Sequence, residues 1–142
     1  MLVLCCGNRD RGDDAAGLAV AERLLELGLP VETCTGEASE LMEKWGKASD
    51  VLVIDAIVTG APAGKIYFWD VKDVEFARNL FPSTHGLGLS EAIGIARSLG
   101  GLPARLRICG IEARQFETGK ALSPDVRKGV EELVRMLAVA RE

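Results

Sequence analysis

Residues 1–14 of this chain read Met1-Leu2-Val3-Leu4-Cys5-Cys6-Gly7-Asn8-Arg9-Asp10-Arg11-Gly12-Asp13-Asp14. The first six are apolar without polar alternation, which is typical of a strand buried on both faces of a parallel sheet. Gly7 and Gly12 then bracket a polar turn, and the spacing of apolar residues becomes helical from Asp13 onward. The apolar stripe of that helix is expected to contain Leu18, Ala21 and Leu25. The stretch therefore predicts a central strand, a turn and a helix that opens with two adjacent acids.

Helix capping explains one acid of the pair. Asp13 is a suitable N-cap, and an acid in the first helical turn gains about 0.3–1 kcal/mol from the helix dipole. A second acid beside it, Asp14, follows the carboxyl end of a buried strand, and capping alone does not account for it. The spacing of residues alone does not decide whether Asp14 caps the helix or belongs to a functional site.

A strand, a glycine-containing turn and a helix also form the phosphate site of dinucleotide-binding domains. In this chain the three positions that would need glycine hold Cys5, Gly7 and Asp10. The adjacent acids would also repel a pyrophosphate. A nucleotide-binding domain is therefore the weaker alternative.

Composition limits the class of protein. The chain has 142 residues, of which 48% are hydrophobic and 27% charged, so we expect one globular domain over residues 1–142 rather than disorder or a coiled coil. The net charge is −4 and no basic cluster stands out, which argues against nucleic acid as a partner. No apolar stretch approaches the roughly 20 residues that cross a bilayer. We expect a soluble cytoplasmic protein without membrane insertion.

Cysteine and histidine content excludes further classes of site. The four cysteines, Cys5, Cys6, Cys34 and Cys109, lie in or at the end of strand-like runs and form no C-x-x-C pair, so buried reduced thiols are expected. His85 is the single histidine. The chain can therefore form neither an H-E-x-x-H zinc site nor a zinc site with three histidines.

The rest of the chain alternates between strand-like and helical segments. Apolar runs predict strands over residues 31–35, 51–54, 65–69 and 106–112. Helical spacing predicts helices over 37–45, from 89 to a stop at 100–101, and from 123–125 onward. The short aromatic run 65–69 suits an edge strand that can be antiparallel to the others, and 70–82 has no clear period, as in a mobile or partner-facing loop. This order predicts a single-domain doubly wound α/β fold, a three-layer sandwich with a mostly parallel sheet.

Two more residues are candidates for a site. Asp55 follows the second doubly buried run, and ligands of open α/β sheets bind outside the carboxyl ends of the strands. His85 precedes a predicted helix, where the dipole favours the neutral imidazole that serves as ligand or base. A turn-forming acid and a surface histidine are the simpler interpretations. Together Asp14, Asp55 and His85 can reach one rim, where they would suit a borderline divalent metal or acid/base hydrolysis.

The ordered motifs resemble a known family. They are Gly7-Asn8, Gly12-Asp13-Asp14 and Gly17, Val53-Ile54-Asp55-Ala56, Gly64-Lys65-Ile66-Tyr67, Ser83-Thr84-His85-Gly86-Leu87-Gly88-Leu89 with Glu91-Ala92, Gly110-Ile111-Glu112 and Leu122-Ser123-Pro124. This combination is similar to the hydrogenase maturation proteases along the whole chain. The resemblance implies an aspartic-type endopeptidase that removes a C-terminal extension from the large subunit of a nickel-iron hydrogenase after nickel insertion.

The resemblance also implies the site. The catalytic and nickel-recognising positions of the family fall on Asp14, Asp55 and His85, and the nickel is carried by the substrate, a nickel-loaded large-subunit precursor. Three positions depart from the family pattern: Cys5 and Ala15, where glycine is usual, and Asp10, where an apolar residue is common. They bear on the shape of the first turn and on which hydrogenase is processed.

Several mechanisms remain open at this point. An acid can activate water while nickel polarises or positions the peptide, or nickel can be a checkpoint while Asp14 or Asp55 is the general base. A Ser or Cys nucleophile with His85 is a third route, although Cys5 and Cys6 lie in a buried strand and Ser83 is too close in sequence for a convincing dyad. A non-enzymatic module that binds a metal centre or a partner through the same rim is the alternative from another class.

Overall fold

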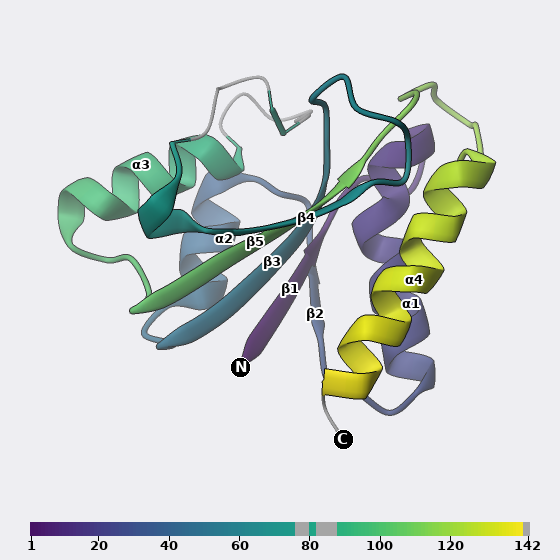
Figure 1. Ribbon diagram of the computed structural model, residues 1–142. Helices are drawn as coiled ribbons and strands as arrows, with labels where there is room; N and C mark the ends of the chain where they lie inside the picture. Colours follow the sequence, from purple (N-terminus) through teal and green to yellow (C-terminus); the bar gives the residue numbers. More distant parts are fainter. Residues whose placement is uncertain (76–79, 82–87, 141–142) are drawn as a thin grey trace.

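A mixed sheet of five strands forms the middle of the molecule (Figure 1). The computed structural model describes residues 1–75, 80–81 and 88–140. The strands are β1 (Leu2–Cys6), β2 (Glu32–Cys34), β3 (Asp50–Ile57), β4 (Ile66–Asp70) and β5 (Arg105–Glu112). Their order across the sheet is β2-β1-β3-β5-β4, with β4 antiparallel to β5 and all other neighbours parallel. The mostly parallel sheet with an antiparallel edge strand is therefore confirmed.

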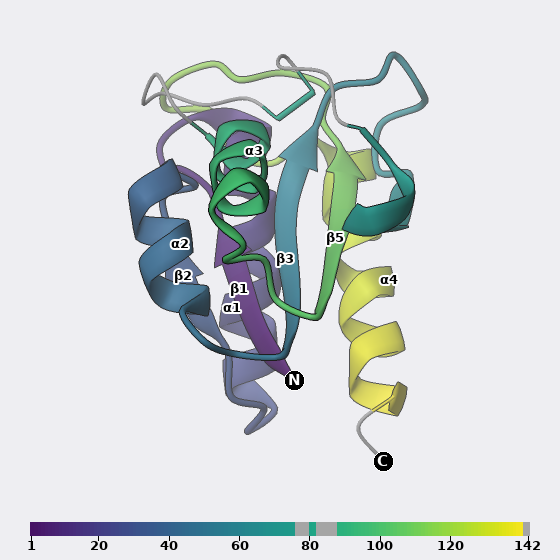
Figure 2. The same cartoon turned by 90° about the vertical axis from the view of Figure 1, so that its left-hand side faces the viewer.

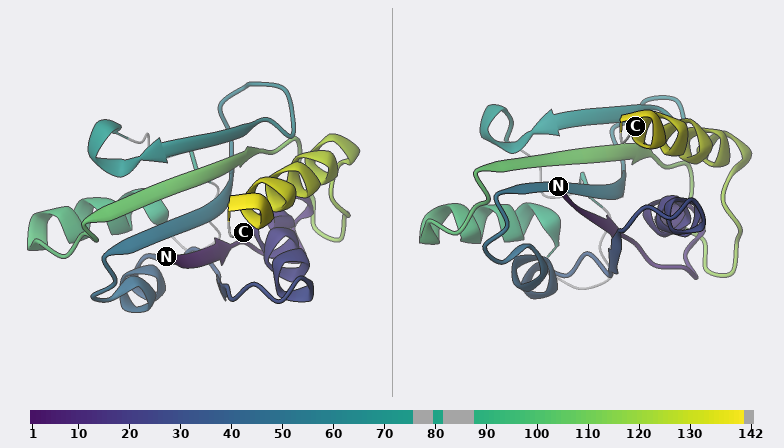
Figure 3. Two further views of the ribbon diagram at one scale, coloured as in Figure 1. Left: turned by 60° about the horizontal axis from the view of Figure 1, so that its bottom comes forward. Right: turned by 90° about the horizontal axis from the view of Figure 1, so that it is seen from below.

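Helices cover both faces of this sheet. They are α1 (Ala16–Glu26), α2 (Ala38–Trp45), α3 (Leu89–Leu99) and α4 (Pro124–Ala140), with short 3-10 helices η1 (Gly12–Ala15) and η2 (Val71–Asp73). Helices α2 and α3 lie side by side on one face, and α1 and α4 on the other (Figures 1 and 2). The view along the sheet from below shows the sheet between the two helical layers (Figure 3). This is the doubly wound three-layer sandwich that the sequence predicts.

The uninterrupted apolar runs have a simple structural cause. In β3, Val51 and Val53 pack into the core under α2 and α3, whereas Leu52 and Ile54 pack into the core under α1 and α4. Because both faces of the strand are covered, neither set of alternating positions is polar. Asp55 is the exception, and it lies two residues before the end of β3 at Ile57. The strand is thus longer than the predicted 51–54.

Close backbone contacts fix the start of α1 over the end of β1. A Cβ atom at Gly17 would lie 2.2 Å from the carbonyl oxygen of Cys6, and one at Gly7 would lie 2.2 Å from the carbonyl oxygen of Asp14. Both positions therefore need glycine for close approach rather than for flexibility. As a result η1, which carries Asp14, is held directly above the carboxyl end of β1.

The helix that follows the two acids differs from the prediction in two respects. Asp13 lies inside η1 and is not an N-cap; the residue before η1 is Arg11, which makes no side-chain cap. The buried stripe of α1 contains Val20, Ala21 and Leu24, whereas Leu25 is 51% exposed. The predicted stripe was therefore right at Ala21 and wrong at Leu25, which lies one position beyond the buried Leu24.

Other sequence-based expectations have mixed outcomes. All four cysteines are free and buried, as predicted. In the 70–82 segment, Val71 of η2 and Phe81 are buried, and residues 76–79 and 82 lie outside the described part of the chain. Among the described residues, no helix is long and apolar enough to cross a membrane.

Candidate active site at the carboxyl edge of the sheet

Asp14 is a buried acid whose two carboxylate oxygens have different surroundings. The residue is 3% exposed. Its Oδ2 lies 3.5 Å from Nη1 of Arg11, forming an ion pair. Its Oδ1 is buried and has no hydrogen-bond partner among the described residues. A buried carboxylate oxygen without a donor is costly unless something else binds it, so this atom points to a ligand.

Asp55 reaches the same edge from β3. It is 4% exposed, and its Oδ1 accepts a hydrogen bond of 2.8 Å from the backbone N–H of Ala56. Its Oδ2 faces Gly36, where an added Cβ would lie 3.9 Å from Oδ2 and 3.8 Å from Cβ of Cys6. Gly36 has a φ of +89°, a conformation that favours glycine, so this side of Asp55 stays free of a side chain.

The two acids influence each other's protonation. Burial raises the pKa of Asp14 to about 6, and the Arg11 charge partly opposes this. Burial, followed by the charge of Asp14, raises the pKa of Asp55 well above its usual value, and the Ala56 N–H partly opposes this. The charge of Asp14 therefore makes ionisation of Asp55 less favourable.

The third predicted site residue, His85, lies outside the described residues. Among the residues that are described, no group of three or more His, Cys, Asp or Glu side chains could hold a metal ion. The structure therefore brings Asp14 and Asp55 together, and the place of His85 stays a prediction. Two carboxylates with one unsatisfied oxygen suit an incoming cation but do not form a closed metal site.

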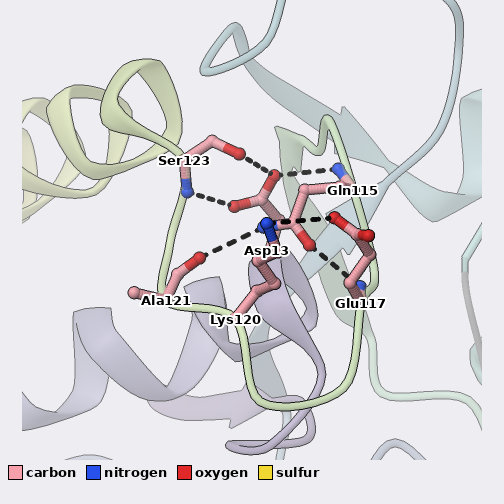
Figure 4. A network of polar contacts seen from close by, with 6 residues as sticks. All are labelled: Asp13, Gln115, Glu117, Lys120, Ala121 and Ser123. Carbon is pink, nitrogen blue, oxygen red and sulfur yellow. Dashed lines mark hydrogen bonds and ion pairs between the residues drawn. The ribbon is translucent and has the colours of Figure 1, made fainter.

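Asp13 has a role that sequence reasoning missed (Figure 4). Its carboxylate is fully buried and accepts four hydrogen bonds from the 113–123 loop. They come from Ser123 N at 2.7 Å and Ser123 Oγ at 2.8 Å, and from the backbone N–H groups of Arg114 and Gln115 at 2.8 and 3.1 Å. Asp13 thereby fixes this loop to η1, and so stabilises the turn that holds Asp14.

The Gln115 side chain adds a second layer to the same network. It donates to the carbonyl oxygen of Ala121 at 3.1 Å and accepts from the backbone N–H of Glu117 at 2.9 Å (Figure 4). Its Oε1 occupies the space beside Gly12, where an added Cβ would lie only 2.1 Å away. The loop-like segment predicted after β5 is thus ordered by polar contacts, of which those between Asp13 and Ser123 are buried.

Arg11 joins the turn to this loop. Its backbone forms an antiparallel bridge with Thr118, and its guanidinium carbon lies 5.5 Å from the centre of the Phe116 ring. No local pattern in the sequence indicates these contacts, because each partner other than Asp14 lies more than a hundred residues away along the chain.

Comparison with known proteins decides the class. The family model for hydrogenase maturation proteases matches residues 34–140. The chain belongs to the hydrogenase maturation protease family. Hydrogenase 2 maturation protease of Escherichia coli K12 is 30% identical over all of this chain and 91% of its own length. This confirms the resemblance seen in the sequence and makes the chain a hydrogenase maturation endopeptidase by family.

Solved structures agree with this assignment. The E. coli hydrogenase maturating endopeptidase HybD superposes with a TM-score of 0.80 at 27% identity, covering 98% of this chain and 90% of HybD. The HybD protease of Thermococcus kodakarensis has a TM-score of 0.76 at 24% identity, covering 99% and 98% of the two chains, which shows the shared fold.

Cys5 and Cys6 of this maturation protease are buried thiols that resist ionisation. Burial, together with the neighbouring Cys34, raises the pKa of Cys5 to about 12. A hydrogen bond with Cys34, burial and the Asp55 carboxyl group raise the pKa of Cys6 well above its usual value. Since the thiolate is the reactive form, the cysteine route considered from the sequence loses support.

Glu112 is a further buried acid of the maturation protease, at the end of β5. It is 1% exposed. Its carboxylate accepts a hydrogen bond of 2.9 Å from the backbone N–H of Thr59 and a second hydrogen bond from the Thr59 hydroxyl. Both carboxylate oxygens therefore have donors, whereas Oδ1 of Asp14 has none among the described residues. Glu112 anchors the turn between β3 and β4, and sequence reasoning had assigned it no role.

Proposed function

We propose that this chain removes the C-terminal extension of a nickel-iron hydrogenase large-subunit precursor after nickel has been inserted. One observation carries the proposal: the buried, unpartnered Oδ1 of Asp14 beside the Asp55 carboxyl group at the carboxyl edge of the sheet. Family membership supports the reaction class and the substrate class.

The nickel in this proposal belongs to the substrate. Asp14 and Asp55 would offer one carboxylate oxygen each, and His85, which matches the histidine motif of the family, would complete the set with an imidazole. Nickel accepts imidazole and carboxylate ligands, and a ligand set shared between two proteins forms only when the loaded precursor docks. The enzyme would thus recognise a precursor by the metal that it already holds.

The protonation of the acids favours a hydrolytic role. With a pKa of about 6, Asp14 is charged at neutral pH, which suits a carboxylate that binds the nickel of the precursor. Asp55, whose pKa is raised by burial and by that charge, suits a general base that takes a proton from water as the water oxygen attacks the scissile carbonyl carbon, and then gives this proton to the leaving amine. Water is consumed, the peptide bond breaks, and Asp55 returns to its starting state.

The test combines the precursor with variants of the site. Nickel-loaded precursor is incubated with wild type, Asp14→Asn, Asp55→Asn or His85→Ala, and its mass is measured. Each variant is expected to lose processing while keeping the wild-type circular dichroism spectrum. Asp10→Asn is the matched control, because Asp10 is an exposed acid of the same turn.

The outcomes separate the two classes of function. Cleavage that survives all three substitutions would contradict the site assignment. If the wild type binds the nickel-loaded precursor but leaves its mass unchanged, the chain is a binding module rather than a protease.

A further inference from the structure

The Arg11 guanidinium occupies a fixed position beside the site. It lies over the Phe116 ring, its Nη1 is 3.5 Å from Asp14 Oδ2, and its backbone is bridged to Thr118. The Arg11 side chain is 29% exposed and that of Asp14 is 5% exposed, so the ion pair is partly shielded from water. A guanidinium that packs against a ring loses less rotamer freedom when it binds a carboxylate than a free surface side chain does.

This contact makes the two oxygens of Asp14 unequal. Oδ2 faces the cation, and Oδ1 is the buried atom without a partner. Carboxylates that bind metals are commonly oriented by an outer donor on the second oxygen. We propose that Arg11 is a positioning residue, which holds Asp14 by Oδ2 and so presents Oδ1 to the nickel of the substrate. The inference rests on the proposed function, since it names what orients one of its acids.

Two other roles for Arg11 predict different mutant behaviour. If Arg11 only packs against Phe116, a neutral side chain of similar length should replace it. If it only attracts an acidic precursor, any nearby exposed cation should contribute in a similar way. Arg9, two residues earlier in the same turn and exposed, is the matched control for the second role.

Three substitutions distinguish these roles. Arg11→Met keeps an apolar stem against Phe116 and removes the charge. Arg11→Lys keeps the charge but removes the planar group, so it should restore part of the function. Arg9→Met removes an exposed charge from the same turn. Arg11→Gln is a second neutral variant. It takes the place of Arg11→Met, with the same expected result, if the Met variant aggregates.

The measurement is single-turnover cleavage of nickel-loaded precursor over a range of enzyme concentrations. Arg11→Met should lower the saturating rate by about 10–100-fold, the usual effect of losing an outer-shell partner, without a matching change in the half-saturating concentration. Arg11→Lys should recover at least part of that rate, and Arg9→Met should match wild type.

Several results would overturn the inference. A wild-type rate for Arg11→Met or Arg11→Gln would show that the ion pair does not matter. Equal loss in the Met and Lys variants would show that the positive charge of Arg11 is not what positions Asp14, and an equal rise in the half-saturating concentration for Arg9→Met and Arg11→Met would assign Arg11 to docking. If wild type fails to cleave, or Asp14→Asn cleaves normally, the proposed function itself fails. If those two behave as expected and Arg11→Met cleaves normally, only this inference fails.

Discussion

At the scale of single residues, Asp13 and Asp14 are neighbours in the sequence with opposite surroundings. Among the described residues, Asp13 accepts four hydrogen bonds from the 113–123 loop, whereas Asp14 has one ion pair and an oxygen without a partner. A fully satisfied buried acid contributes to the structure, and an unsatisfied one is available for a ligand. Asp13 therefore holds the loop, and Asp14 is the acid of the pair that we propose for the site.

Removing the Asp13 carboxylate should destabilise the fold. Asp13→Ala leaves the buried N–H group of Ser123 and the partly buried N–H group of Arg114 without acceptors, and we expect a loss of about 2–4 kcal/mol in the free energy of unfolding. Urea denaturation measures it. Asp10→Ala, an exposed position in the same turn, should change stability by less than about 0.5 kcal/mol. Equal stability of the two variants would contradict the loop-anchoring role.

Asp14 should make stability depend on pH in a defined direction. Burial raises its folded-state pKa from 3.8 to about 6, so the folded state binds the proton more tightly than the unfolded state. Its contribution is fully present below about pH 4 and is lost as the pH rises through about 6. Asp14→Asn should flatten this decline and raise stability at pH 7 by on the order of 1–3 kcal/mol.

Unfolding curves for wild type and Asp14→Asn at several pH values check this prediction. The two curves should separate as the pH rises from about 4 to about 7, because only the wild type loses the contribution of proton binding by Asp14. If the Asn variant is less stable than wild type by the same amount at every pH, Asp14 does not have a raised pKa.

At the scale of elements, the site depends on how α1 is seated. Gly17 lets the first turn of α1 approach the carbonyl oxygens of Cys6 and Ile54, which lie in neighbouring strands. Those backbone atoms cannot move without disturbing β1 and β3, which carry the turn and Asp55. The position of η1, and with it Asp14, follows from this contact.

Two helical glycines give a matched test of the seating. Gly17→Ala would place a Cβ 2.2 Å from Cys6 O and 2.9 Å from Ile54 O, so we expect a loss of about 1–3 kcal/mol despite the better helix propensity of alanine. Gly94→Ala in α3 meets no atom within 4 Å and should stabilise by up to about 1 kcal/mol. Thermal unfolding separates the two, and a gain in both would refute the close seating.

At the scale of the whole molecule, the sheet was predictable and the site only in part. Strands buried on both faces have a pattern that the sequence displays directly, so the sandwich and the antiparallel edge followed from residues such as those of β3 and β4. The contacts of Asp13 and Arg11 with the 113–123 loop join positions about a hundred residues apart, and no local pattern specifies them. Leu25 was wrongly expected in the buried stripe of α1, because helical spacing alone does not tell which of two overlapping stripes faces the sheet.

The residues of the proposed site also predict how tightly the isolated protein binds divalent metal. The proposed ligands are two carboxylates and one imidazole with no thiolate pair beside them, which suits an open site of modest affinity, so the free enzyme should hold divalent metal weakly. After dialysis against a chelator, elemental analysis should find far less than one equivalent of nickel or zinc. A full retained equivalent would indicate a resident metal and argue against metal carried by the substrate.

We propose above that the acids at the carboxyl edge recognise the nickel held by the precursor and that the precursor is then cleaved. Intact-mass spectrometry of one precursor preparation, divided into nickel-loaded and nickel-free halves, tests this most directly. With wild type, only the nickel-loaded half should lose a single C-terminal fragment, and with Asp14→Asn neither half should change. Equal cleavage of both halves, or cleavage by Asp14→Asn at the wild-type rate, would contradict the account.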